Sequence, residues 1–187
     1  LLGPSDSPGV SPDKGPPIVA APVTPTPTAA PKAQIVEVAD SEIAAQVRAA
    51  LEEGRVSGAE QRLAELERVS PNHPDLGELH DQLLSAKTRA DLVEQLALAK
   101  AAFDDGRLLA PINDNALTFY RDAVGLEPHN DIAEEGIDRV AVRVASAARA
   151  AIAAKEFNKA QALLSAAAER KLSRPELAQA SKALATA

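Results

Sequence analysis

Three stretches of this sequence carry the same helix-forming pattern, and this repetition constrains the fold more than any other feature. In each stretch, a residue suited to cap a helix lies two positions before an alanine, and a large residue follows that alanine by four positions. The three sets are Ser57, Ala59 and Leu63; Asp114, Ala116 and Tyr120; and Asn158, Ala160 and Leu164. A small residue one turn before a large one is what two closely crossed antiparallel helices require. The chain is therefore expected to consist of repeated helical hairpins.

The composition favours helices throughout the body of the chain. Ala, Leu, Glu, Gln, Arg and Lys are strong helix formers, whereas aromatic residues account for only 2% of the 187 residues. A chain of this length has room for one domain and a tail. We expect an all-α domain in which each alanine buries little surface, so that modest stability is spread along an elongated body.

The tail is rich in proline. Nine of the 14 prolines fall within the first 31 residues, and Gly, Ser and Thr fill most of the gaps. Proline removes a backbone donor and disfavours helix in the residue before it. Residues 1–39 are therefore predicted to be a disordered Pro/Thr/Ala-rich linker with polyproline-II character. An inert linker is the simplest interpretation; the alternatives are a stand-off spacer from an anchor and a ligand for a proline-recognition domain.

Helix start and stop signals place the helical domain at residues 40–187. The expected hairpins span about 41–70, 75–126 and 131–171, followed by a capping helix at 174–186. The first helix is predicted to begin at Asp40 or Ser41, and the segment from Pro74 to Gly106 is one long helix or two nearly collinear ones. Later helices are expected to begin with the capping residues Ser57, Asp114 or Asn115, Asn130 or Asp131, Asn158 and Ser173.

Residues 40–187 resemble the tetratricopeptide repeat (TPR), a helical hairpin with a glycine between its helices, an alanine five residues later, a large residue one turn on, and a closing proline. The matching residues are Gly54, Ala59, Leu63 and Pro71; Phe103, Gly106, Ala116, Tyr120, Ala123 and Pro128, with 108–113 as an insertion; and Phe157, Ala160, Leu164 and Ala167, with Lys155 in place of the glycine. The spacings, 116 − 59 = 57 and 160 − 116 = 44, exceed the family's period of about 34 residues. The resemblance implies an irregular, TPR-like, short right-handed solenoid.

The overall layout resembles the extracytoplasmic part of certain proteobacterial membrane-anchored proteins, namely TonB-type energy transducers and transmembrane Ser/Thr kinases. The matching residues are Gly106-Arg107-Leu108, Pro111, Asp114-Asn115-Ala116-Leu117, Tyr120-Arg121 and Pro128. The sequence holds no TonB carboxy-terminal domain and no kinase motif. The resemblance thus implies a place, the periplasm, with an anchor in a segment outside this chain, and no activity.

No pattern in the sequence indicates catalysis, a cofactor or a metal. The chain has no cysteine, and its histidines, His73, His80 and His129, lack the i, i+4 spacing of a helical metal site. Asp104 and Asp105 are adjacent, so their carboxylates point in different directions on a helix. Phosphate-binding loops and nucleophile elbows are missing. A net charge of −7 argues against a nucleic-acid partner.

The candidate binding residues are Arg48, Lys100, Phe103 and Arg149. The three basic residues each lie six positions before the turn residue of a hairpin (Gly54, Gly106, Lys155), on helices that line the concave face in TPR-type folds. A basic ladder in an acidic protein would suit an acidic segment or a terminal carboxylate, and Phe103 would add an apolar contact. The alternative is that these are solvated side chains whose aliphatic stems cover an Ala-rich surface.

The sequence therefore predicts a non-enzymatic scaffold that binds a protein or peptide partner in a helical groove, or that self-associates as a homo-oligomer. The competing hypothesis is a passive structural spacer between a membrane anchor and a missing C-terminal domain. A binding module is expected to expose an apolar or single-sign groove, whereas a spacer is expected to be evenly polar.

Overall fold

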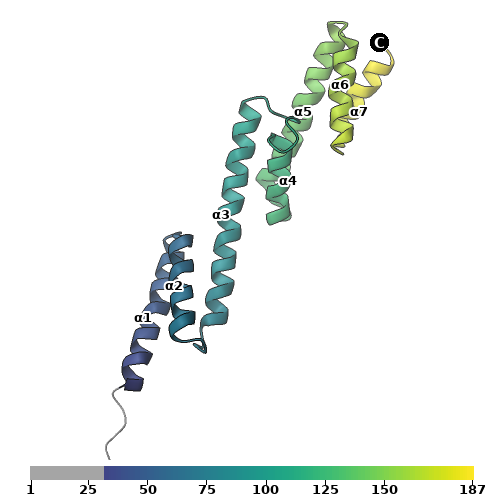
Figure 1. Ribbon diagram of the computed structural model, residues 1–187. Helices are drawn as coiled ribbons and strands as arrows, with labels where there is room; N and C mark the ends of the chain where they lie inside the picture. Colours follow the sequence, from purple (N-terminus) through teal and green to yellow (C-terminus); the bar gives the residue numbers. More distant parts are fainter. Residues whose placement is uncertain (1–31) are drawn as a thin grey trace, which may run out of the picture.

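Seven α-helices follow one another along residues 32–187 (Figure 1). The computed structural model describes the backbone of residues 32–187 and the side chains of residues 39–187, so the predicted disorder of residues 1–31 lies outside the described part. Within it there is no β-strand, and the all-α prediction is confirmed. The helices are α1 (Lys32–Glu52), α2 (Val56–Val69), α3 (Leu76–Asp104), α4 (Ala116–Leu126), α5 (Asp131–Ala153), α6 (Phe157–Glu169) and α7 (Pro175–Ala185).

The first helix is longer than expected. It begins at Lys32 rather than at Asp40 or Ser41, so residues 32–39, which were assigned to the linker, are helical. This segment contains neither proline nor glycine, and nothing in it interrupts a helix once Pro31 has been passed. For the segment from Pro74 to Gly106, where either one long helix or two nearly collinear ones were expected, the structure has a single helix of 29 residues, α3.

Two helix starts are capped as predicted. The side chain of Asn115 accepts a hydrogen bond from the backbone N–H of Thr118 (3.0 Å), and that of Asn130 accepts one from Ala133 (3.0 Å). Each asparagine thereby satisfies a backbone donor that has no partner inside its helix. Both have extended backbone angles typical of this position.

The capping roles predicted for Ser57, Asn158 and Ser173 are wrong. The residues at the three N-cap positions are Arg55, Glu156 and Arg174, and none of them makes a side-chain capping bond. The turn after the preceding helix leads the chain straight into α2 and α6, so Ser57 and Asn158 already lie in the first helical turn. At α7, Pro175 occupies the start of the helix, where its lack of an N–H costs nothing.

The turns that close α1, α3 and α5 share one backbone geometry. Gly54, Gly106 and Lys155 all have a left-handed conformation, with φ of 70°, 78° and 62°. In each turn this residue donates to the carbonyl three positions earlier, and the next residue donates to the carbonyl five positions earlier, over distances of 2.8–3.1 Å. This is the Schellman motif, which usually places glycine at the left-handed position. Lys155 therefore occupies a position that suits glycine better.

Lys155→Gly should accordingly stabilise the protein. A non-glycine residue in the left-handed region costs about 1–2 kcal/mol, part of which is offset by the greater backbone freedom of glycine in the unfolded chain. We expect a net gain of about 1 kcal/mol in the free energy of unfolding, measured by urea denaturation. The reverse change at the matching position, Gly106→Lys, should lose a similar amount. A loss of stability in Lys155→Gly would contradict this account.

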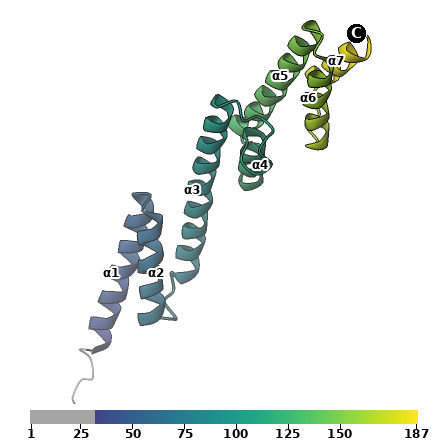
Figure 2. The same ribbon diagram turned by 45° about the horizontal axis from the view of Figure 1, so that its top comes forward.

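The helices pack in a nearly one-dimensional series. Each helix contacts its neighbours in sequence, and the only contacts two places apart among the described helices join α1 to α3, α3 to α5 and α5 to α7. The odd-numbered helices therefore touch one another, whereas α2, α4 and α6 do not. Figures 1 and 2 show the resulting elongated body, with α1 and α7 at opposite ends.

Two separate hydrophobic cores lie on opposite sides of α3. Leu79 and Leu83 belong to the core shared with α1 and α2, whereas Ala99 and Ala102 belong to the core shared with α4–α7. From Leu83 to Ala99 is 99 − 83 = 16 residues, about four and a half turns, which carries the contact to roughly the other side of the helix. Figures 1 and 2 show the α1–α2 hairpin and α4 flanking α3 on opposite sides. No residue of α3 between Leu83 and Ala99 is buried.

The three alanines of the predicted hairpin pattern lie at helix contacts. Ala59, Ala116 and Ala160 are each fully buried. The second hairpin adds a close approach that the pattern did not include, because Gly136 of α5 lies directly against the ring of Tyr120 of α4. A small residue at each crossing lets the helix axes come close together.

Candidate functional site

Two of the four predicted binding residues tie successive odd-numbered helices together. The guanidinium of Arg48 in α1 forms an ion pair with Asp75 at the start of α3 (2.5 Å). Arg149 in α5 donates to the side-chain oxygen of Gln179 (3.1 Å) and the carbonyl of Glu176 (3.3 Å), both in α7. Each arginine thus donates hydrogen bonds within the chain, to residues at or near the start of the next odd-numbered helix.

The other two predicted residues lie together near the end of α3. Lys100 forms an ion pair with Asp104 one turn later (2.6 Å), and this hydrogen bond raises the pKa of Lys100 and lowers that of Asp104. Phe103, half-buried, packs against the second core. The structure therefore brings Lys100 and Phe103 to one place, where α3 meets α5, and leaves Arg48 and Arg149 at the neighbouring α1–α3 and α5–α7 contacts.

Two further arginines, which the sequence did not predict as binding residues, lie against Phe103. The guanidinium carbons of Arg139 and Arg143, one turn apart on α5, lie 4.7 Å and 4.9 Å from the centre of the Phe103 ring. Arg143 also donates to the backbone carbonyl of Phe103 (2.8 Å). Both distances are typical of cation–π contacts, in which the ring holds a cation without neutralising it. We call Phe103, Arg139 and Arg143 the aromatic–arginine site.

A shallow hollow of about 440 Å³ lies beside these three residues. Val142 contributes to its wall and remains 47% exposed. The remaining lining residues come from the same face of α5, and they are Glu135, Asp138 and Ser146. The site thus combines an apolar surface with two guanidinium groups at a junction of odd-numbered helices.

The charges around the site are unevenly compensated. Lys100 is paired with Asp104, and Asp138 is paired with Arg174 of the segment before α7. Among the described residues, Arg139 and Arg143 have no carboxylate within ion-pair distance. Two like charges one turn apart on a helix repel each other unless something compensates them. Here the Phe103 ring compensates them only in part.

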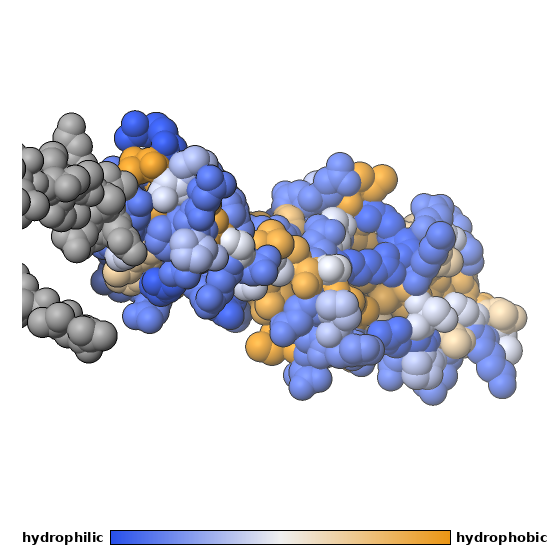
Figure 3. Space-filling view, turned by 90° about the horizontal axis from the view of Figure 1, so that it is seen from below, coloured by the Kyte–Doolittle hydropathy of each residue, from blue (hydrophilic) through white to orange (hydrophobic). Residues whose placement is uncertain are grey.

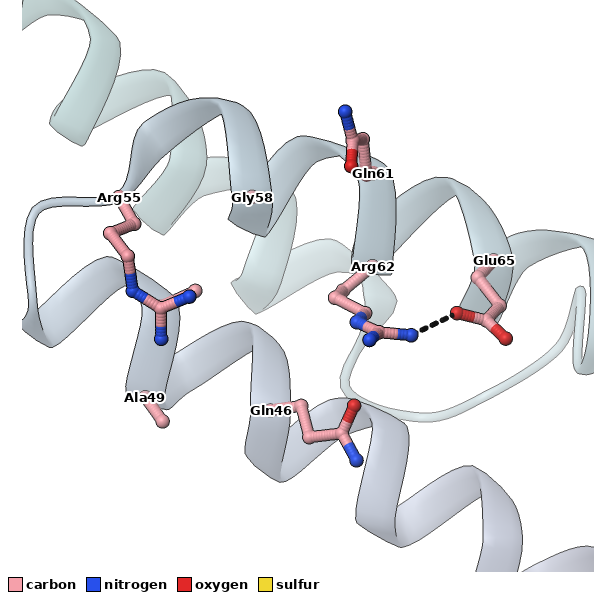
Figure 4. Close-up of a pocket in the computed structure, with 8 residues that line it drawn as sticks. Gln46, Ala49, Arg55, Gly58, Gln61, Arg62 and Glu65 are labelled. Carbon is pink, nitrogen blue, oxygen red and sulfur yellow. Dashed lines mark hydrogen bonds and ion pairs between the residues drawn. The ribbon is translucent and has the colours of Figure 1, made fainter.

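A second hollow, of about 520 Å³, lies between α1 and α2 (Figure 4). Small residues, among them Ala49 and Gly58, border it, and longer polar side chains surround it. Its two arginines are already paired, Arg55 with Glu53 (2.5 Å) and Arg62 with Glu65 (2.8 Å). This hollow therefore offers no unpaired arginine to a ligand.

A third hollow, of about 370 Å³, lies where the loop after α3 meets α5 and α6. Its walls are almost wholly aliphatic, with Leu108, Val144 and Leu163 as the larger side chains. The one charged lining residue, Lys159, forms an ion pair with Glu156 (2.9 Å). This hollow offers apolar surface but no unpaired polar group that would orient a ligand.

The contact between Arg48 and Asp75 predicts that the pKa of Asp75 depends on Arg48. The hydrogen bond from Arg48 holds the pKa of Asp75 below its usual value. Its contribution to stability is therefore present at neutral pH and is lost as the pH falls through the range in which Asp75 becomes protonated. Arg48→Gln should raise the pKa of Asp75 in a carboxyl carbon NMR titration, while that of Asp104, whose partner is Lys100, stays unchanged. An unmoved Asp75 titration would refute the pairing.

The described residues offer little to other kinds of site. No group of three or more His, Asp or Glu side chains in this part of the chain is placed to hold a metal ion. His80 pairs with Glu67 (2.5 Å), and His129 approaches Glu134 (3.7 Å). Of the seven helices, none is both long and apolar enough to cross a bilayer.

No family model, curated protein or solved structure matches this chain.

Proposed function

We propose that this chain is a non-enzymatic interaction module that binds a protein or peptide partner on the face formed by α3 and α5. The aromatic–arginine site is the observation that carries the proposal. It presents two guanidinium groups and an exposed valine at one place, and arginine and aromatic residues are enriched at the centres of protein interfaces.

The arrangement of the helices supports a TPR-like interpretation of the fold. Contacts confined to adjacent helices and to the odd-numbered series are what stacked hairpins produce, since the first helix of each hairpin lines a common face. The left-handed turns after α1, α3 and α5 also support this interpretation, although α6 closes with the same geometry at Lys171. We accordingly propose an irregular, right-handed TPR-like solenoid preceded by a disordered proline-rich linker.

We also propose a location. The module is proposed to lie in the periplasm, with its anchor in a segment outside this chain, and the support is the resemblance of its layout to extracytoplasmic regions of proteobacterial membrane-anchored proteins. The proline-rich residues 1–31 would hold the module away from the membrane surface, because extended proline-rich segments span about 3 Å per residue.

One observation favours the alternative, a passive spacer. No residue of α3 between Leu83 and Ala99 is fully buried, and Leu84 and Val93 there are 65% and 63% exposed. A long, weakly packed helical segment between two packed bodies sets a distance. Against an evenly polar spacer, Figure 3 shows hydrophobic patches on one face of the otherwise hydrophilic surface of the described residues.

A position-specific cross-linking experiment separates the two functions. The native chain has no cysteine, so a single cysteine can carry a photoreactive benzophenone at a chosen place. Ser146→Cys puts the probe in the hollow beside the site, and Ser85→Cys puts it on an exposed part of α3. An interaction module should give a cross-linked partner from the native compartment at Ser146→Cys but not at Ser85→Cys.

The cross-link must also be saturable. An excess of unlabelled wild-type chain should abolish it, whereas an excess of a chain carrying Arg139→Glu and Arg143→Glu should not. Equal, non-saturable labelling at both positions would reject the interaction module and favour the spacer.

A further inference from the structure

We infer that the aromatic–arginine site recognises an internal acidic segment of its partner, in which side-chain carboxylates alternate with apolar residues. The inference deepens the proposed function and depends on it. It commits to side-chain carboxylates within a peptide, rather than to a free chain terminus, because exposed apolar residues lie along α5 both before and after Arg139, at Ile132 and Val142.

The unused donors of the arginines indicate a carboxylate ligand. A guanidinium carries five N–H donors in a planar fork. In the described part of the chain Arg139 makes no hydrogen bond and Arg143 makes one, to the carbonyl of Phe103. The ring holds the centre of each guanidinium but takes none of its N–H donors, so these donors remain for two-pronged binding of a carboxylate.

The apolar residues along α5 indicate what flanks the carboxylates. Ile132, Arg139 and Arg143 are separated by seven and four residues, so they lie along one side of the helix. Ile132 is 64% exposed, and Val142 borders the arginines from the next position round the helix. From Ile132 to Val142 the helix rises about 15 Å, a distance covered by about five residues of an extended peptide. A terminal carboxylate would use only one end of this length.

Two acidic residues that line the same hollow bear on how an acidic ligand can bind, because carboxylates repel one another. Asp138 is neutralised by its ion pair with Arg174, but Glu135 has no ion-pair partner among the described residues. On the α3 side, the hydrogen bond from Lys100 lowers the pKa of its partner Asp104, and the charges of both arginines help to lower it. The ligand's carboxylates are therefore expected to lie away from the unpaired Glu135. Removing the charge of Glu135 should strengthen binding, an effect that a purely structural role for the arginines would not produce.

The test uses displayed peptide libraries and the full chain. Degenerate 12-residue peptides at the exposed end of a phage coat protein have no free carboxy terminus, and a second library presents free carboxy termini. We expect the first library to yield sequences with Asp or Glu interleaved with aliphatic residues. For a synthetic representative measured by fluorescence anisotropy, replacing Asp and Glu by Asn and Gln should weaken binding about tenfold or more, since charged hydrogen bonds contribute about 1.5–3 kcal/mol each.

Matched variants then locate the binding. Arg139→Gln with Arg143→Gln should weaken the representative peptide about tenfold or more, and Arg139→Lys with Arg143→Lys should recover only part of the loss, because lysine lacks the fork. Glu135→Gln should tighten binding. Arg89→Gln, which removes one positive charge from an exposed part of α3, should leave the affinity unchanged.

Failure of the inference can be distinguished from failure of the proposed function. Peptides without acidic residues, selection only from the free-terminus library, no selection at all, or affinity unaffected by the arginine variants would each overturn the carboxylate inference. If saturable cross-linking at Ser146→Cys persisted in any of these cases, the interaction module would stand with a ligand of different chemistry. If that cross-link were also absent, both the carboxylate inference and the proposed interaction module would be rejected.

Discussion

Gly136→Ala should lower the free energy of unfolding by about 2 kcal/mol, although alanine is the better helix former. A Cβ at position 136 would overlap three carbons of the Tyr120 ring, which is itself almost fully buried. Overpacking of a core costs about 1–3 kcal/mol, occasionally more, whereas the change from glycine to alanine in a helix returns up to about 1 kcal/mol. The ring is held between α4 and α5, so it cannot move aside without disturbing the core. Urea denaturation followed by circular dichroism measures the effect.

The control is another helical glycine with open space around it. No atom lies within 4 Å of a Cβ placed on Gly125 in α4, so Gly125→Ala should stabilise the protein by up to about 1 kcal/mol. The two alanine substitutions should thus have opposite signs. In a Tyr120→Ala background the overlap is gone, and Gly136→Ala should become stabilising. Equal effects at positions 125 and 136 in the wild-type chain would refute the close contact.

Asn115→Ala should cost about 3 kcal/mol of unfolding free energy, more than an ordinary helix cap. Asn115 is fully buried, and its side chain bonds in two directions. It accepts from the N–H of Thr118, and it donates to the carbonyls of Pro111 (2.5 Å) and Ile112 (3.1 Å) in the preceding loop. Loss of a cap costs about 1 kcal/mol, and each lost hydrogen bond to a carbonyl adds about 1 kcal/mol. Urea denaturation gives the magnitude.

Asn130→Ala is the matched control, because Asn130 caps α5 in the same way but makes no hydrogen bond to a loop carbonyl. Its loss should cost about 1 kcal/mol. Asn115→Asp keeps the accepting oxygen but removes both donated bonds, so its cost should lie nearer to that of Asn115→Ala. If the two asparagines were equally sensitive to alanine, the loop contacts of Asn115 would contribute nothing.

Much of the fold was predictable because its signals are local. The helix starts at or next to Asn115 and Asn130, the uninterrupted helical pattern before Gly106 and the alanine contacts at positions 59, 116 and 160 follow from neighbouring residues and helical spacing, although the sequence left open whether the pattern before Gly106 forms one helix or two. The helix starts at Arg55 and Glu156 were missed because the closing turn of one helix decides where the next begins. The left-handed turn at Lys155 shows that a position in the fold can outweigh the preference of its residue.

The site was only half predictable, for a different reason. Helical spacing placed Lys100 and Phe103 on one helix, but their contact with α5 depends on how α3 and α5 cross, which periodicity does not determine. One signal for Arg139 and Arg143 was available, since two like charges four residues apart destabilise an isolated helix and call for a compensating group. Similarly, an isolated glycine within a helical pattern, such as Gly136, usually marks a close packing contact.

The exposed middle of α3 sets the relative orientation of two packed bodies through its number of residues. The core of the first body includes Leu79 and Leu83, the core of the second is packed by α3 residues from Leu92 onward, and no other helix joins the two bodies among the residues described. Inserting one residue after Arg89 would leave each body intact while turning the α1–α2 hairpin by about 100° around the helix axis and lengthening the molecule by about 1.5 Å. The direction of the α1–α2 hairpin relative to the face of α5 thus depends on how many residues α3 contains.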